Sequence, residues 1–230
     1  MVTVLVAITI VPSAPVLVPA LAGAAAAELA DLREAVLEAA ATLPDRWIAI
    51  GTGPADTSWS PDSAGTFAGF GVDVAVALSP RAAQNATLPL PGLIAGWLRG
   101  QVRPTAHVQV RTFAATQSSG SALDLGREMR ATIDADRDPV GVLVVADGCN
   151  TLTPSAPGGH DPESLAVQAV VDDALATGDT TALAASPDSV GGRVPFAVLA
   201  GLAAPGPHAA KELYRGAPFG VGYAVDIWQP

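Results

Sequence analysis

Residues 139–150 read PVGVLVVADGCN, and this stretch decides the fold class. Its first eight residues are almost continuously apolar and rich in Val, which is typical of a strand buried on both faces of a parallel sheet. Residues 2–11, VTVLVAITIV, repeat the pattern near the start of the chain. A sheet built from such strands must be covered on both faces, so we expect helices to pack on either side of it.

Segments with strand and helix patterns alternate on both sides of this stretch. The expected further strands are residues 47–50, 72–78, 106–113 and 214–228, and the expected helices are residues 24–43, 88–99, 123–134, 161–177, 180–185 and 193–203. Residues 12–19 and 51–71 are rich in Pro, Gly and Ser and are expected to be loops. This order predicts an α/β protein with three α/β/α layers around a mostly parallel or mixed central sheet. Because no repeat or linker is visible, we expect a single domain over residues 1–230.

Composition narrows the function classes. The net charge of −10 disfavours a nucleic acid or an anionic membrane as partner, because both would be repelled by the protein's own field. The only cysteine, Cys149, excludes a disulfide framework and a multi-cysteine Zn site. The apolar start of the chain has no basic region, and Pro12, Pro15 and Pro19 interrupt it, so we do not expect a signal peptide. The protein is expected to be cytoplasmic.

Three loops that follow predicted strands carry polar residues. They are residues 12–15, 51–56 and 147–151. In open α/β sheets ligands bind beyond the carboxyl ends of the strands, so these loops form one cleft if their strands are neighbours. The side chains and backbone expected to line that cleft for a small-molecule ligand are Ser13, Thr52, Gly53, Asp56, Asp147, Cys149 and Asn150, with His160 as a further candidate.

Individual residues in these loops leave more than one interpretation open. Asp147 could be a metal ligand, a general base or a cap for the turn that Gly148 begins. Cys149 could be a nucleophile or an inert buried thiol, and no His lies beside it in the sequence to activate it. His160 precedes a predicted helix between glycines and carboxylates, which suits either a surface residue or a ligand. Asp147, Cys149 and Asn150 are the candidates for catalysis.

Three segments together resemble a known family. VPSAPVLVP at 11–19, VVADGCN at 144–150 and APFGVGY at 217–223 are similar, in this order, to signature segments of the class III extradiol ring-cleavage dioxygenases. This LigB-like superfamily also contains the Memo-type proteins. APGGHDP at 156–162 is similar to a shorter, actinobacterial-type branch. The resemblance implies a three-layer α/β fold with a cleft at the strand ends.

The resemblance also implies an iron site, which these residues do not reproduce. Active members hold Fe(II) through two His and a carboxylate, and a further His acts as acid and base. The corresponding positions here are Ser13, residues 51–54 without a His, and Asn150. Only Asp147 keeps a side chain that binds metal, and one carboxylate does not replace the facial triad. We therefore expect no metal cofactor at the inherited position.

Three functions remain in consideration at this level. The first is a dioxygenase-like protein that has lost its iron and binds a small molecule or a protein partner. The second is an active metal-dependent enzyme, a dioxygenase or hydrolase, with Fe(II) or Zn held by relocated ligands around Asp147, Cys149 and His160, with Asp56 nearby. The third is an assembly subunit, either in a homo-oligomer or beside a separate catalytic chain. Convergence of these side chains in space would favour the second function.

Overall fold

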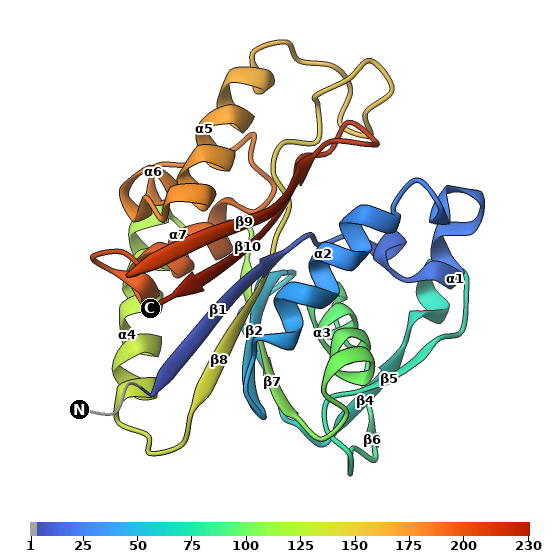
Figure 1. Cartoon of the computed structure of the whole chain (residues 1–230), viewed down its shortest axis with the longest axis vertical. Coiled ribbons are helices and arrows are strands. Elements are labelled where there is room, and N and C mark those ends of the chain that lie inside the picture. Colours follow the sequence, from blue (N-terminus) through green and yellow to red (C-terminus); the bar gives the residue numbers. More distant parts are fainter. Residues whose placement is uncertain (1–3) are drawn as a thin grey trace.

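The central feature of the computed structural model, which describes residues 4–230, is a seven-stranded sheet of order β3-β7-β2-β8-β1-β10-β9 (Figure 1). The strands are β1 (Leu5–Val11), β2 (Arg46–Gly53), β3 (Thr57–Trp59), β7 (His107–Ala114), β8 (Val140–Val145), β9 (Ala209–Gly216) and β10 (Tyr223–Gln229). β7, β2, β8 and β1 run parallel, whereas β3, β10 and β9 are antiparallel to their neighbours. The predicted mixed sheet is therefore confirmed.

The strand β8 lies between β2 and β1, in the middle of the parallel part. All six of its residues are buried, which explains the continuous apolar run in the sequence. A Cβ atom on Gly141 would lie 2.6 Å from a ring carbon of Pro44, so the chain after α2 packs directly on the backbone of β8. β1 matches the other apolar run from Leu5 onward, and residues 2–3 of that prediction lie outside the described residues.

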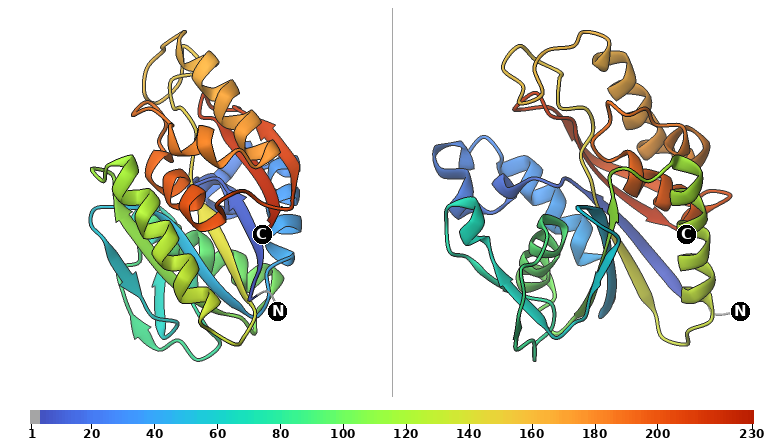
Figure 2. Two further views of the ribbon diagram at one scale, coloured as in Figure 1. Left: turned by 90° about the vertical axis from the view of Figure 1, so that its left-hand side faces the viewer. Right: turned by 180° about the vertical axis from the view of Figure 1, so that it is seen from behind.

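Helices cover both faces of the sheet (Figures 1 and 2). One face carries α2 (Ala30–Ala41) and α3 (Leu90–Val102), and the other carries α4 (Ser119–Asp134), α5 (Ser164–Thr177), α6 (Thr180–Ala184) and α7 (Arg193–Ala203). Each face has its own cluster of buried apolar residues. The predicted three layers are confirmed. No helix within residues 4–230 is both long enough and apolar enough to span a membrane.

Two glycines let α4 and α7 approach closely. A Cβ atom on Gly126 of α4 would lie 2.0 Å from the carbonyl oxygen of Val198. A Cβ atom on Gly201 of α7 would lie 2.0 Å from the carbonyl oxygen of Leu123. The two helices therefore meet backbone to backbone, and this contact positions the start of α7 beside the start of α4.

Two predictions about the strands are wrong. Residues 54–71 are not one loop, because they contain β3 and β4 (Ser63–Thr66), and β4 pairs with β5 (Ala75–Ala77) and β6 (Gln84–Asn85) in a small second sheet. β3, β4 and β6 have two to four residues, too few for an alternating pattern to appear, whereas β5 lies within the strand expected over residues 72–78. Residues 214–228 are not one strand either, because the chain turns at 217–222 between β9 and β10. β9 lies at the sheet edge and has no buried residue, so its sequence lacks an apolar run.

The helix boundaries shift mainly at their N-terminal ends. The helix expected over residues 24–43 begins at Ala30, because Gly23 has a positive φ of 53° and starts a separate 3-10 turn. The loop expected over residues 12–19 contains the 3-10 turn Pro15–Leu17 and leads into the short α1 (Pro19–Ala22). α5 begins at Ser164, after Pro162. α7 has the bounds that the sequence predicted.

Candidate functional site: a polar cavity at the strand ends

The three predicted loops meet because β1, β8 and β2 are adjacent and parallel. Their carboxyl ends lie at one edge of the sheet, so the segments after Val11, Val145 and Gly53 lie side by side. The backbone N–H of Ser13 donates a 2.7 Å hydrogen bond to Oδ1 of Asp147. Two of the predicted site residues are therefore in direct contact across 134 residues of sequence.

Asp147 has an unusual electrostatic position. Burial raises the pKa of its carboxyl to about 6, and the hydrogen bond from Ser13 offsets part of this effect by favouring the charged form. Its backbone carbonyl accepts a 2.7 Å hydrogen bond from Gly192, directly before α7. Burial, and then the charge of Asp147, raise the pKa of the Tyr223 phenol. Asp147 thus links the end of β8 to the start of α7 and lies near the start of β10.

The APFGVGY segment holds the turn that follows β8. Gly148 donates a 2.8 Å hydrogen bond to the carbonyl of Gly222, and Gly222 donates a 2.8 Å hydrogen bond to the carbonyl of Cys149. The Cys149 N–H donates to Oε1 of Gln168 at 2.7 Å. Cβ atoms on Gly148 and Gly222 would lie 2.1 and 2.3 Å from the Gln168 side chain. The two glycines therefore admit the amide of Gln168 between them, which gives this motif a packing role.

Cys149 lies in the apolar core and not at the cleft. Its exposed fraction is 0%, and it forms an isolated antiparallel bridge with Val190. Burial raises the pKa of its thiol, so the thiolate is disfavoured at neutral pH. In this position Cys149 has the environment of a structural residue. A role as nucleophile would require the turn to open.

A cavity of about 660 Å³ lies beside these loops, at the ends of β2 and β7. Its lining comes from the end of β2, from the loop between β7 and α4, and from the segment that leads into α7. The lining residues are Thr52, Ala115, Thr116, Gln117, Ser118, Asp188, Val190, Gly191, Arg193 and Val194. Of the predicted ligand-binding residues, only Thr52 is among them.

The predicted residue Asp56 supports the cavity wall and is not part of the lining. Its carboxylate accepts hydrogen bonds from the backbone N–H of Ala114 at 2.8 Å and from the Gln117 side chain at 2.6 Å. Gln117 is itself a lining residue. Asp56 therefore fixes the shape of the loop after β7, while its own side chain is engaged.

Sequence reasoning missed both charged residues of the cavity lining, Arg193 and Asp188. The Nε of Arg193 lies 3.0 Å from Oδ1 of Asp188, and its Nη2 donates a 3.0 Å hydrogen bond to the carbonyl of Ala115. The part of the lining that lies between β7 and α4 could have been predicted from the sequence. Residues 106–113 were predicted as a strand, and the polar residues that follow it, TQSS at 116–119, occupy the same kind of strand end as the three loops considered.

Gly53, Asn150 and His160 do not line this cavity. A Cβ atom on Gly53 would lie 2.7 Å from Thr112, so the glycine serves the close approach of β2 and β7. Asn150 is exposed, and its carbonyl accepts a 2.9 Å hydrogen bond from Gly158. His160 is exposed in the loop that leads to α5. The structure therefore does not place these three residues in the lining of the cavity with Thr52, and their roles stay predictions.

The residues at the strand ends do not fit a ferrous ion of the kind the resemblance implies. Within residues 4–230, no group of three or more His, Cys, Asp or Glu side chains is arranged to hold a metal ion. His107 begins β7 at the opposite edge of the sheet, and His208 precedes β9 at that same edge. Asp147 is the one strong metal donor at the position that the resemblance indicates, and its Oδ1 accepts from the backbone N–H of Ser13. The relocated grouping of Asp147, Cys149 and His160 is not assembled.

The comparison with solved structures gives a fold likeness. The uncharacterized protein JW3007 from Escherichia coli K12 matches with a TM-score of 0.61 and 11% sequence identity, over 98% of this chain and 100% of that chain. At this identity the likeness concerns the fold alone. No protein-family model matches the sequence, and no curated protein matches it either.

Proposed function

We propose that this chain is a divergent LigB-like protein of the class III extradiol dioxygenase type that binds a small molecule without ring-cleavage chemistry. The observation that carries the proposal is the cavity of about 660 Å³ at the carboxyl ends of β2 and β7, whose lining contains no His. Binding sites of open α/β sheets lie at this edge. The volume falls within the range of small-molecule pockets.

The loss of ring cleavage follows from the donor set. Oxygen activation by Fe(II) in this superfamily needs imidazole ligands, and the positions that should supply them hold Ser13, residues 51–54 without His, and Asn150. The backbone of Ser13 is turned toward Asp147 and donates to its carboxylate. Asp147 is thus used to join two loops. This use supports a structural role at the place where the family binds its metal.

The cavity can bind a ligand by hydrogen bonds and by the positive charge of Arg193, which is paired with the exposed Asp188. Thr52, Gln117 and Ser118 supply neutral donors and acceptors, and Arg193 supplies the charge. Ala115, Val190 and Val194 supply apolar surface. Such a mixture holds and orients a polar small molecule, and it contains no nucleophile paired with a base.

The test combines a binding assay with a metal assay on untagged protein. Thermal-shift screening with small polar molecules should identify ligands that raise Tm, and a cavity-filling variant, Gly191→Trp, should remove the shift. Gly191 is an exposed lining residue, but its Cβ would lie 3.3 Å from the carbonyl oxygen of Gly148, so the Tm of the variant without ligand must first show that it folds. Gly100→Trp, on an exposed face of α3 with no atom within 4 Å, is the matched control.

The metal assay tests the proposed loss of the iron site. After anaerobic incubation with Fe(II) and removal of free metal, elemental analysis should find far less than one iron per chain. Near-stoichiometric iron that is lost in Asp147→Asn, together with oxygen uptake in the presence of catechols, would overturn the loss of ring cleavage. A ligand shift that persists in Gly191→Trp would show that the cavity is not the binding site.

A further inference from the structure

We infer that the cavity beside Arg193 recognises an oxyanion, the carboxylate or phosphate of a small organic acid. This inference rests on the proposed function, because it requires the cavity to be a ligand site. It goes further by naming the ligand class. The observations behind it are a cavity large enough for a small organic molecule and a guanidinium group in its wall with unused donors.

Arg193 retains hydrogen-bonding capacity toward the cavity. A guanidinium carries five N–H donors. Nε forms an ion pair with Asp188 at 3.0 Å, and Nη2 donates one N–H to the carbonyl of Ala115. A third, on Nη1, reaches Oγ of Ser119 at 3.5 Å, which is long for a hydrogen bond. Two N–H groups are left over, and a carboxylate or phosphate is the partner that matches a guanidinium best.

Asp188 is the main competitor for Arg193, and it is a weak one. The Arg193 side chain is 14% exposed, whereas the Asp188 side chain is 96% exposed. An ion pair with one fully hydrated partner contributes little to stability. An incoming oxyanion can therefore replace Asp188 at Nε, while the bond from Nη2 to Ala115 keeps the guanidinium in place. Removing the charge of Asp188 should strengthen anion binding.

The start of α4 adds neutral donors next to the lining residue Ser118. Ser118 caps the helix by accepting from the N–H of Ser121 at 3.1 Å. The N–H groups of Ser119 and Gly120 precede the first intrahelical bond, so they lie in the part of the helix that favours anions. They are secondary here, because the charge of Arg193 and the cavity define the site. Arg193 is the one cation among the lining residues of a protein with a net charge of −10.

The experiment titrates the protein with three probes of similar size: benzoate, phenyl phosphate and the neutral benzamide. Backbone amide shifts in NMR locate each probe, with the lining residues Gln117 and Gly191 as reporters of the cavity. We expect benzoate or phenyl phosphate to shift these amides, and benzamide to bind at least about tenfold more weakly. Comparing the first two probes separates a carboxylate site from a phosphate site.

Variants assign the effect to Arg193. Arg193→Gln should weaken anion binding about tenfold or more, and Asp188→Asn should strengthen it severalfold. Arg130→Gln is the matched control, because it removes the same charge from an ion pair on α4 outside the cavity lining. Since Arg193→Gln can also weaken the fold by releasing the Ala115 loop, the gain in Asp188→Asn is the independent readout.

Two results would overturn the inference. Equal binding of benzamide and benzoate at the cavity amides, unaffected by Asp188→Asn, would mean that charge plays no part, and the proposed small-molecule site would stand. Absence of cavity shifts with all three probes would also overturn it. The proposed function would then be decided separately, by whether the ligands from the thermal-shift screen lose binding in Gly191→Trp.

Discussion

Asp226 occupies an unfavourable position for a carboxylate. It lies on β10 between Val225 and Ile227, which pack on the face covered by α2, so its side chain points to the opposite face with Trp228. Its exposed fraction is 1%, and neither carboxylate oxygen has a hydrogen-bond partner among the described residues. A buried ionised group without partners is strongly disfavoured.

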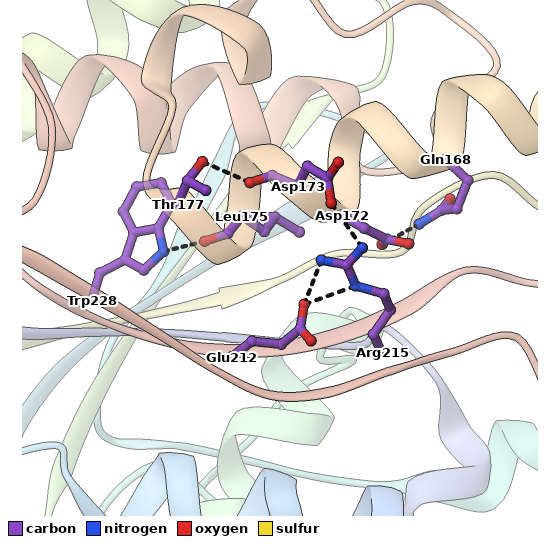
Figure 3. A network of polar contacts seen from close by, with 8 residues as sticks. All are labelled: Gln168, Asp172, Asp173, Leu175, Thr177, Glu212, Arg215 and Trp228. Carbon is purple, nitrogen blue, oxygen red and sulfur yellow. Dashed lines mark hydrogen bonds and ion pairs between the residues drawn. The ribbon is translucent and has the colours of Figure 1, made fainter.

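The groups around Asp226 do not relieve this cost. Burial, followed by the charges of Glu212 and Asp172, raises its pKa to about 8, and Arg215 opposes the shift only weakly. Figure 3 shows why: Arg215 is engaged by Glu212 and by Asp173 of α5, and Gln168 is engaged with Asp172. Asp226 is therefore expected to be protonated in the folded protein at neutral pH.

The effect of Asp226 on the free energy of unfolding follows from proton linkage. The folded-state pKa is about 8 and the unfolded value is about 3.9, so the folded chain binds the extra proton between these values and stability falls as pH rises through this window. At about 1.36 kcal/mol per pH unit, ionisation of Asp226 in the unfolded chain lowers the free energy of unfolding, relative to its value below pH 3.9, by about 4 kcal/mol at pH 7 and about 1.5 kcal/mol at pH 5. Asn has the shape of the protonated acid and does not ionise.

Asp226→Asn should therefore raise the free energy of unfolding at pH 7 by up to about 4 kcal/mol, and its advantage should shrink by about 2.5 kcal/mol at pH 5. Urea unfolding of both proteins at pH 5, 6, 7 and 8 measures this. Asp173→Asn, which removes an exposed carboxylate 2.9 Å from Arg215, is the control and should change stability by about 0–1 kcal/mol without this pH trend. A variant less stable than the parent at pH 7, or an advantage independent of pH, would refute the reasoning.

Three further predictions concern the strand-end turn. Gly222→Ala should lower the free energy of unfolding by about 2 kcal/mol or more, because its Cβ would lie 2.3 Å from Gln168. Gly100→Ala, which has open space around its Cβ position, should be neutral or slightly stabilising. Thermal melts measure both variants, and equal effects would contradict this prediction. Cys149 should react slowly with a thiol reagent in native buffer and quickly in denaturant, and fast native reaction would show that the thiol is accessible. The Asp147 carboxyl should titrate near pH 6 in carbon-detected NMR, and its contribution to stability should fall as pH rises from about 4 to 6; a midpoint near 4 would mean that it is fully hydrated.

Local patterns in the sequence were enough for the two elements with long apolar runs. The apolar run at residues 139–146 predicted the buried strand β8 (Val140–Val145), and residues 193–203 predicted α7 with its observed bounds. Both signals are local, because an element that is buried all round requires an uninterrupted apolar run, about six residues for a strand and more than ten for a helix. The same reasoning failed for β9, since an exposed edge strand needs no apolar face.

The amino-acid sequence by itself determined the layered α/β class, and it placed polar loops after the strands that became β1, β2 and β8. Only the tertiary structure decided that these loops touch through Ser13 and Asp147, and that the cavity lies beside them at β7. The cavity brings Thr52, Gln117 and Arg193 together from three distant parts of the chain. Strand order and the docking of α7 on α4 set these distances. They depend on long-range packing, which no local period in the sequence encodes.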